Sequence, residues 1–239
     1  MWTICKKELQ QFFSNLTGYI AIILFLLING IFLFVLKDGI FDFGYATLDK
    51  FFELAPWILL FLVPAITMRT LSDEFKAGTF EILQTRPITK WQIVAGKYFA
   101  VIIVILFVIL PTLIYVVAIK NLSASGGIDS GGIVGSYIGL VFLAAVFASI
   151  GLCCSGFSNN AVIAFLIGVF ACLIIYFGFS ALSKLSFFAN GPDYYIEMMG
   201  IDFHYSSMSR GVLDSRDLIY FLSVIFLFML ITVKNLHKK

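Results

Sequence analysis

Long apolar stretches alternate with short polar segments along this chain. Residues 18–36, 98–119 and 130–183 carry no charged side chain. A helix needs about 20 apolar residues to cross a bilayer core of roughly 30 Å. The polar run Ser155–Asn160 lies near the middle of 130–183 and predicts a tight turn between two membrane spans.

Two shorter apolar runs complete the pattern, one around Pro56 and Pro64 and one before the basic C-terminal tail. The chain is therefore predicted to be all-α, a polytopic membrane protein with six transmembrane helices in a single domain, residues 1–239. A composition of 61% hydrophobic and 13% charged residues agrees with this class. The predicted spans are residues 18–36, 54–70, 98–119, 133–155, 160–183 and 217–233.

The first run has a signal peptide as its alternative, because Lys6 and Lys7 precede it. However, 18–36 is longer than the usual apolar core of a signal peptide, and no A-x-A-like cleavage site follows Leu36. With six spans, both termini lie on one side of the membrane. That side holds ten of the 16 Lys and Arg residues and only four of the 14 acids. The positive-inside rule then predicts that both termini and residues 72–97 are cytoplasmic.

The first 16 residues have the pattern of an amphipathic helix. Lys6, Lys7, Gln10, Gln11 and Ser14 share one face. We expect residues 1–16 to form an interfacial elbow helix that lies in the membrane plane. A frayed cytoplasmic tail is the alternative, but it would leave large apolar side chains in water. The apolar face comprises Trp2, Cys5, Leu9, Phe12, Phe13 and Leu16.

The polar insert 72–97 predicts two short helices. Ser72 resembles an N-cap, and the semi-apolar stripe of Phe75, Thr79, Ile82 and Leu83 extends the first helix to residue 85, before Pro87. Thr89 and Gln92 form a capping-box pattern that begins the second helix, with Ile88 and Ile93 as its hydrophobic staple. This second helix continues through Gly96 and Lys97 into the third span.

Motifs for catalysis or metal binding are missing from the sequence. Gly96-Lys97 lacks the rest of a phosphate-binding P-loop, and neither a GxSxG nor an HExxH pattern occurs. His204 and His237 are too far apart to suggest a metal site. Cys153 and Cys154 could be a redox pair, but packing between helices is the preferred interpretation. We therefore expect no catalytic residue, no metal and no cofactor in this chain.

The motif Glu74-x-x-x-Gly78-Thr79-x-Glu81-x-Leu83, followed by Pro87-Ile88 and Gly96-Lys97, resembles the coupling region of ABC-2-type transporter permeases. The likeness extends over essentially the whole chain. It is most similar to the gliding-motility-associated permease subunits of Bacteroidota. This further likeness rests on the segments MWTICKKELQQFFSNLTGYI, APWILLFLVPAITMRT and GIDFHYSSMSRGVLDSRDLIYFLS.

The resemblance implies a non-catalytic permease subunit in a bacterial inner membrane. Its partners would be a dimeric cytosolic ABC ATPase, which binds ATP and Mg²⁺, and a second six-span subunit with an extracytoplasmic domain. Membrane lipid surrounds it, and no nucleic acid is expected. Export or mechanical transduction, as in gliding motility, would be its function. The implied ATPase-coupling residues are Glu74, Gly78, Thr79, Glu81, Leu83, Arg86 and Pro87.

For two of these residues, physical chemistry also supports a role in coupling. Gly78 would permit close backbone approach, and Glu81 could pair with an arginine of the ATPase. A solvated helix without a partner is the alternative for this segment. A secondary, ion-coupled transporter is the alternative for the whole chain. It would need ionisable residues near the middle of the membrane, and the strongest spans contain none.

The segment 184–216 mixes aromatic and ionic residues before the last span. By the resemblance, it would form an extracytoplasmic hairpin of short re-entrant helices. Buried non-helical backbone needs polar partners, so we expect its charges to satisfy one another. A solvated loop with an aromatic belt is the alternative. The residues singled out here are Asp202, Ser209, Arg210, Gly211, Asp214, Arg216 and Asp217.

Overall fold

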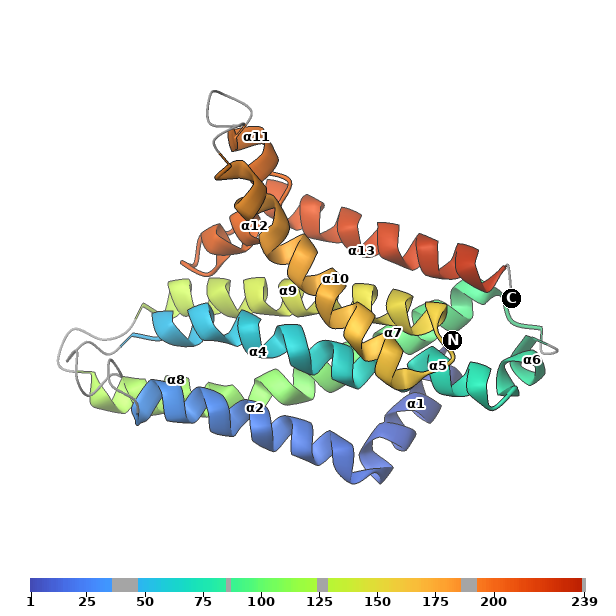
Figure 1. The fold of residues 1–239 in the computed structure, drawn as a ribbon. Helices are drawn as coiled ribbons and strands as arrows, with labels where there is room; N and C mark the ends of the chain where they lie inside the picture. Colours follow the sequence, from blue (N-terminus) through green and yellow to red (C-terminus); the bar gives the residue numbers. More distant parts are fainter. Residues whose placement is uncertain (36–46, 85–86, 124–128, 186–192, 238–239) are drawn as a thin grey trace.

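A computed structural model describes residues 1–35, 47–84, 87–123, 129–185 and 193–237, in which every regular element is a helix (Figure 1). The all-α prediction is confirmed for these residues. Their elements are α1 (Trp2–Ser14), α2 (Leu16–Phe34), α4 (Asp49–Thr67), α5 (Arg69–Lys76), α6 (Thr79–Gln84), α7 (Lys90–Ile109), η1 (Leu110–Thr112), α8 (Leu113–Leu122), α9 (Ser130–Phe157), α10 (Ala161–Ser183), α11 (Asp193–Glu197), α12 (Ile201–Met208) and α13 (Ser215–Leu236).

Five helical stretches are long and apolar enough to cross a membrane. A sixth is added if α1 and α2, which bend by 70° between Ser14 and Gly18, count as one broken span. The count therefore agrees with the six predicted spans in this sense. The end of the first predicted span, Leu36, lies outside the described residues. The five stretches are Asp49–Lys76, Lys90–Leu122, Ser130–Phe157, Ala161–Ser183 and Ser215–Leu236.

Helix α9 forms the centre of the bundle and packs against α4, α10 and α13. Of its most apolar stretch, 83% is buried inside the protein, against 22% for α13. Small residues permit this close packing. A Cβ on Gly151 would overlap the Thr67 hydroxyl of α4, so any larger residue at this position would push the two helices apart.

Two prolines lie inside α4, and one of them creates a bond to a distant helix. Pro56 has no N–H, so the Phe52 carbonyl loses its ordinary helical donor. The Tyr205 hydroxyl of α12 donates to this carbonyl at 2.7 Å. A sequence feature that would weaken an isolated helix thus connects α4 to α12.

Both termini lie at the end of the bundle that carries α5, α6 and the start of α7 (Figure 1). The Met1 carbonyl lies against Gly96 of α7. Lys90 Nζ donates to the Leu236 carbonyl at 2.6 Å. Leu236 is the last residue of α13, where the negative end of the helix dipole stabilises a cation. The two termini therefore share one side of the fold.

Helix α1 packs on α7 as well as leading into α2. Ile4 and Cys5 are buried, whereas Trp2 from the predicted apolar face is 72% exposed. The apolar side chains of residues 1–16 therefore divide into a group that packs against the protein and a group that stays exposed. The position of α1 in the membrane interface stays a prediction.

Candidate functional site

The predicted first helix of the polar insert, residues 72–85, is wrong as a single element. The chain forms α5 up to Lys76 and α6 from Thr79, with Ala77 and Gly78 between them. Ser72 is buried within α5 rather than at its start, and its hydroxyl donates to the Met68 carbonyl at 2.5 Å. The continuous helix of α4 and α5 thus carries the membrane span directly into the insert.

Gly78 explains the break between α5 and α6. Its φ is +67°, a left-handed conformation that favours glycine and commonly ends a helix. A Cβ placed on Gly78 would meet nothing within 4 Å. The observed role of Gly78 is therefore to end α5 and let α6 begin, and its expected close approach to an ATPase stays a prediction.

The break also changes which side chains are buried. Phe80 is buried and contacts Phe75 edge-on, with ring centroids 5.0 Å apart. Thr79 is exposed although the predicted stripe included it. The predicted stripe assumed an unbroken helix. Because the turn at Gly78 breaks the helix, Phe80 rather than Thr79 faces inward.

The remaining expected coupling residues lie on the outer side of this pair of helices. Thr79, Glu81 and Pro87 are exposed, while Leu83 is half-buried. The Thr79 hydroxyl donates to the Glu74 carbonyl at 3.4 Å. Arg86 lies outside the described residues. The exposed surface of α6 therefore presents one carboxylate, Glu81, to the surroundings.

Glu74 has a different environment, because it joins an internal ion-pair cluster with Lys7, Glu8 and Lys97. Lys97 has a fully buried side chain, and its Nζ lies 2.7 Å from Glu8 Oε1 and 2.9 Å from Glu74 Oε1. It also donates to the Thr70 carbonyl. Lys7 approaches the same Glu74 oxygen at 3.1 Å from the exposed side. The cluster therefore links α1, α5 and α7.

A buried ammonium is expensive unless it is paired and hydrogen-bonded. Lys97 satisfies this condition with two carboxylates and one carbonyl. Glu74 Oε2 is buried and has no hydrogen-bond partner within the described ranges. The carboxylate thus uses one oxygen for both lysines and leaves the other for a donor that the described part of the chain does not supply.

Ser155 of α9 attaches the same region to the centre of the bundle. Its hydroxyl donates to the Met68 carbonyl and accepts from the backbone N–H groups of Leu71 and Ser72. The predicted turn at Ser155–Asn160 is wrong in its first half, because α9 extends to Phe157. The Ser155 hydroxyl therefore serves a contact between helices rather than a turn.

The second predicted helix of the insert begins as expected. The Thr89 side chain accepts from the Gln92 N–H, and the Gln92 side chain accepts from the Thr89 N–H. This reciprocal pair confirms the capping box. Helix α7 then runs past the buried Gly96 and Lys97 into the bundle.

The ionic residues of 184–216 do not pair with one another as expected. Asp214 caps α13 by accepting from the Arg216 N–H, and Arg210 Nε donates to the Ser206 carbonyl. Asp217 is buried and lies 2.7 Å from His204 Nδ1. These three charges instead have a local backbone or ring partner. Asp202 is half-buried on α12, and the exposed Arg216 forms no ion pair within the described part of the chain.

His204 holds α12 to the start of α13. Its Nε2 lies 2.9 Å from the Met198 carbonyl, and its ring stacks on Tyr220 at 4.0 Å. Both ring nitrogens therefore face an oxygen, one from the Asp217 carboxylate and one from the Met198 carbonyl. Next to it, burial raises the pKa of Tyr205 far above its usual range and keeps this hydroxyl a donor.

The turn after α12 approaches α9 through glycines. Gly211 has a φ of +83° and lies against Gly132 and Gly135. The Ser136 hydroxyl donates to the Ser209 carbonyl at 2.8 Å. These contacts bring Ser209 and Gly211 to the start of α9. The re-entrant position of this hairpin in a membrane stays a prediction.

Sequence reasoning missed the ion-pair cluster and the His204–Asp217 pair. Lys97 stood at the start of an apolar run, and an isolated lysine there is a weak signal for a buried partner. Glu8 lies 89 residues away, so no local spacing predicts the contact. Within the described residues, no group of His, Cys, Asp or Glu is placed to hold a metal ion.

The sequence was compared with models of known protein families. The model described as ABC-2 family transporter protein matches residues 2–232. This match includes the ion-pair cluster, α5, α6 and the hairpin. A comparison with curated proteins gives no match.

Proposed function

Because this chain belongs to the ABC-2 transporter family, we propose that it is the membrane-spanning permease subunit of an ATP-driven transporter. The ATPase is a separate cytosolic chain, and this subunit is non-catalytic. ATP and Mg²⁺ bind to that partner. Five or six candidate membrane spans and the missing P-loop motif support this assignment.

The observation that carries the proposal is the burial of Lys97 between Glu8 and Glu74. A push on α5 and α6 reaches α7 and α1 through paired charges rather than through a flexible loop. Ser155 adds a connection to α9. Elements that are tied together in this way move as a unit, as a receiver of ATPase movement must.

The exposed side of α6 is the proposed contact with the ATPase. Glu81 would pair with a basic residue there, and the exposed Thr79 and Pro87 are the other residues that we assign to this contact. Glu74 acts as an anchor behind this surface instead of touching the ATPase through Oε1. Gly78 makes the turn before α6, and the resemblance adds Leu83 and Arg86 to the contact.

The proposed setting follows from charge and resemblance. The subunit lies in a bacterial inner membrane with both termini cytoplasmic, since the basic residues concentrate on that side. It pairs with a second six-span subunit that carries an extracytoplasmic domain. Export or mechanical transduction in a gliding-motility complex is the output that the resemblance to gliding-motility-associated permeases implies.

Copurification tests the proposal. The tagged full-length chain, extracted from its native cells in mild detergent, should bring down an ABC ATPase. Glu81→Arg should lower ATPase recovery by about tenfold or more, because the reversed charge repels a basic partner. Glu53→Arg is the matched control, since Glu53 is exposed near the start of α4.

Two results would contradict the proposal. One is a wild-type chain that purifies without any ABC ATPase and transports in response to an ion gradient, which is the behaviour of a secondary transporter. The other is Glu81→Arg protein that keeps both ATPase recovery and ATP-dependent activity at the wild-type level.

A further inference from the structure

A pocket of about 330 Å³ lies where α1, α2, α4, α5 and α7 meet. Its volume falls at the lower end of the range for small-ligand sites, roughly 300–1,000 Å³. None of the ATPase-coupling surface of α6 lines it. The pocket lies beside the bend between α1 and α2, so it opens on the outside of the helix bundle rather than within its α9 centre.

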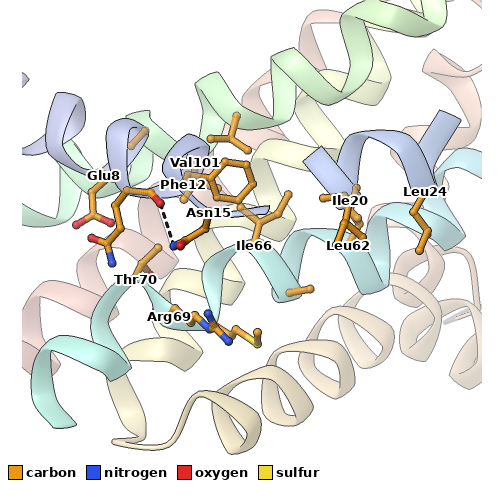
Figure 2. A pocket seen from close by; sticks show the side chains of 16 residues that line it. Glu8, Phe12, Asn15, Ile20, Leu24, Leu62, Ile66, Arg69, Thr70 and Val101 are labelled. Atoms are coloured by element: carbon orange, nitrogen blue, oxygen red, sulfur yellow. Dashed lines mark hydrogen bonds between the residues drawn. The ribbon is translucent and has the colours of Figure 1, made fainter. Parts of the chain in front are cut away.

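The lining is divided into a polar and an apolar end (Figure 2). Glu8, Asn15, Thr70 and Arg69 lie toward one end of the view. Ile20, Leu24 and Leu62 lie toward the other end, on α2 and α4. A molecule that fills this space therefore needs a polar head and an apolar body.

Charge favours an anionic head. Arg69 is exposed and forms no hydrogen bond or ion pair with another described residue, so its guanidinium remains available. Glu8 also lines the pocket, but Lys97 neutralises it at 2.7 Å. The Asn15 side chain donates to the Gln11 carbonyl, which leaves its amide oxygen as an additional polar group at this end. A guanidinium binds phosphate through parallel N–H donors.

We propose that this pocket binds an anionic phospholipid of the surrounding membrane. The phosphate lies at Arg69, and one acyl chain lies along the apolar end between α2 and α4. Two observations carry the proposal: the unpaired Arg69 at the polar end and the continuous apolar wall beyond it. Basic pockets between membrane helices recognise anionic head groups by this chemistry.

A bound lipid would lie between α2 and α4 and contact both helices. Helix α2 contributes Ile20, Ala21 and Leu24 to the wall, while α4 contributes Leu62 and Ile66. An acyl chain between them buries apolar surface on both helices, at about 0.8 kcal/mol per buried CH₂. The bound lipid would thereby hold the bend between α1 and α2 in position.

Photolabelling of the full-length protein tests the proposal. The chain is reconstituted in phosphatidylcholine nanodiscs with a trace of phosphatidylglycerol that carries a diazirine on its acyl chain. Mass spectrometry should locate adducts on α2 and α4 at the pocket wall. Unlabelled phosphatidylglycerol should compete for labelling, whereas inorganic phosphate should not.

Variants separate the head group from the acyl chain. Arg69→Gln should reduce phosphatidylglycerol labelling about fivefold, because one interfacial cation contributes about that factor. Labelling by a phosphatidylcholine with the same diazirine should fall less, because its head group has no net charge. Lys6→Gln is the matched control, since Lys6 is exposed on α1 outside the pocket. Ala65→Trp fills the pocket and should abolish labelling by both lipids.

Ala65→Trp has a matched control and a second variant that can replace it. Ile174→Trp adds the same ring at an exposed position of α10 and should leave labelling intact. If Ala65→Trp does not yield folded protein, Ala21→Phe fills the pocket from α2. Unchanged labelling in Arg69→Gln, labelling of a filled pocket, or competition by inorganic phosphate would each overturn the proposal. No ATPase is present in this assay, so its outcome is independent of the coupling proposal.

Discussion

Removal of the Lys97 charge is the sharpest test of the ion-pair cluster. In Lys97→Met the side chain keeps its length but loses all three polar contacts. Glu8 and Glu74 then face each other with side chains only 12% exposed. Lys7 remains, but it reaches only Glu74 and its side chain is 58% exposed. The variant therefore leaves buried negative charge without adequate compensation.

The size of the effect follows from this burial. Breaking a buried ion pair by removing one partner costs about 3–5 kcal/mol, because the remaining charge stays desolvated. For a chain of this size, about 1 kcal/mol shifts the melting temperature by about 2–4 °C. We expect Lys97→Met to lower the Tm by about 6–20 °C. The matched control, Lys7→Met, should cost less than about 1 kcal/mol because its pair is exposed.

Thermal unfolding of the purified proteins in one detergent measures both variants. A third protein tests the cause: Lys97→Met combined with Glu8→Gln and Glu74→Gln removes the charges together and should recover much of the lost stability. Equal Tm values for Lys97→Met and Lys7→Met would refute the reasoning. A triple variant less stable than Lys97→Met would also refute it.

Two further substitutions test contacts between distant segments. Tyr205→Phe should lower the free energy of unfolding by about 1–3 kcal/mol, because the buried Phe52 carbonyl then has no donor. The same change at Tyr220, which is less buried than Tyr205, should cost less in the same Tm assay; equal losses would argue against the proline-created acceptor. Gly96→Val should displace α1 from α7, because even a Cβ lies 2.9 Å from a backbone oxygen, and should cost about 1–3 kcal/mol. Faster tryptic cleavage within α1 would report this displacement, and an unchanged cleavage rate would contradict it.

Local patterns predicted the elements that depend on local physics. The capping box at Thr89 and Gln92 is confirmed, because its two hydrogen bonds join residues only three positions apart. Uncharged runs of sufficient length predicted spanning helices, since the cost of burying a charge in lipid does not depend on the fold. Gly78 was recognised as important, but its left-handed backbone was not.

Non-local contacts explain the failures. Ser72 resembled a cap and Ser155 resembled a turn residue because each is a polar interruption of an apolar pattern. Their hydroxyl groups instead satisfy backbone groups where α4, α5 and α9 meet. Small polar side chains serve caps, turns and helix contacts equally well, so composition alone does not separate these roles.

The sequence by itself determined that this protein is helical, that it has the spans of a membrane protein and that it resembles ABC-2 permeases. Apolar length and charge distribution carry these properties along the chain. Only the tertiary structure decided that Lys97 is a buried partner of Glu8 and Glu74, and that Asp217 pairs with His204. A charge in a sequence has no assigned partner. The packing of α1 on α7 beside α5 selects the partners of Lys97, and the packing of α12 on α13 selects the partner of Asp217.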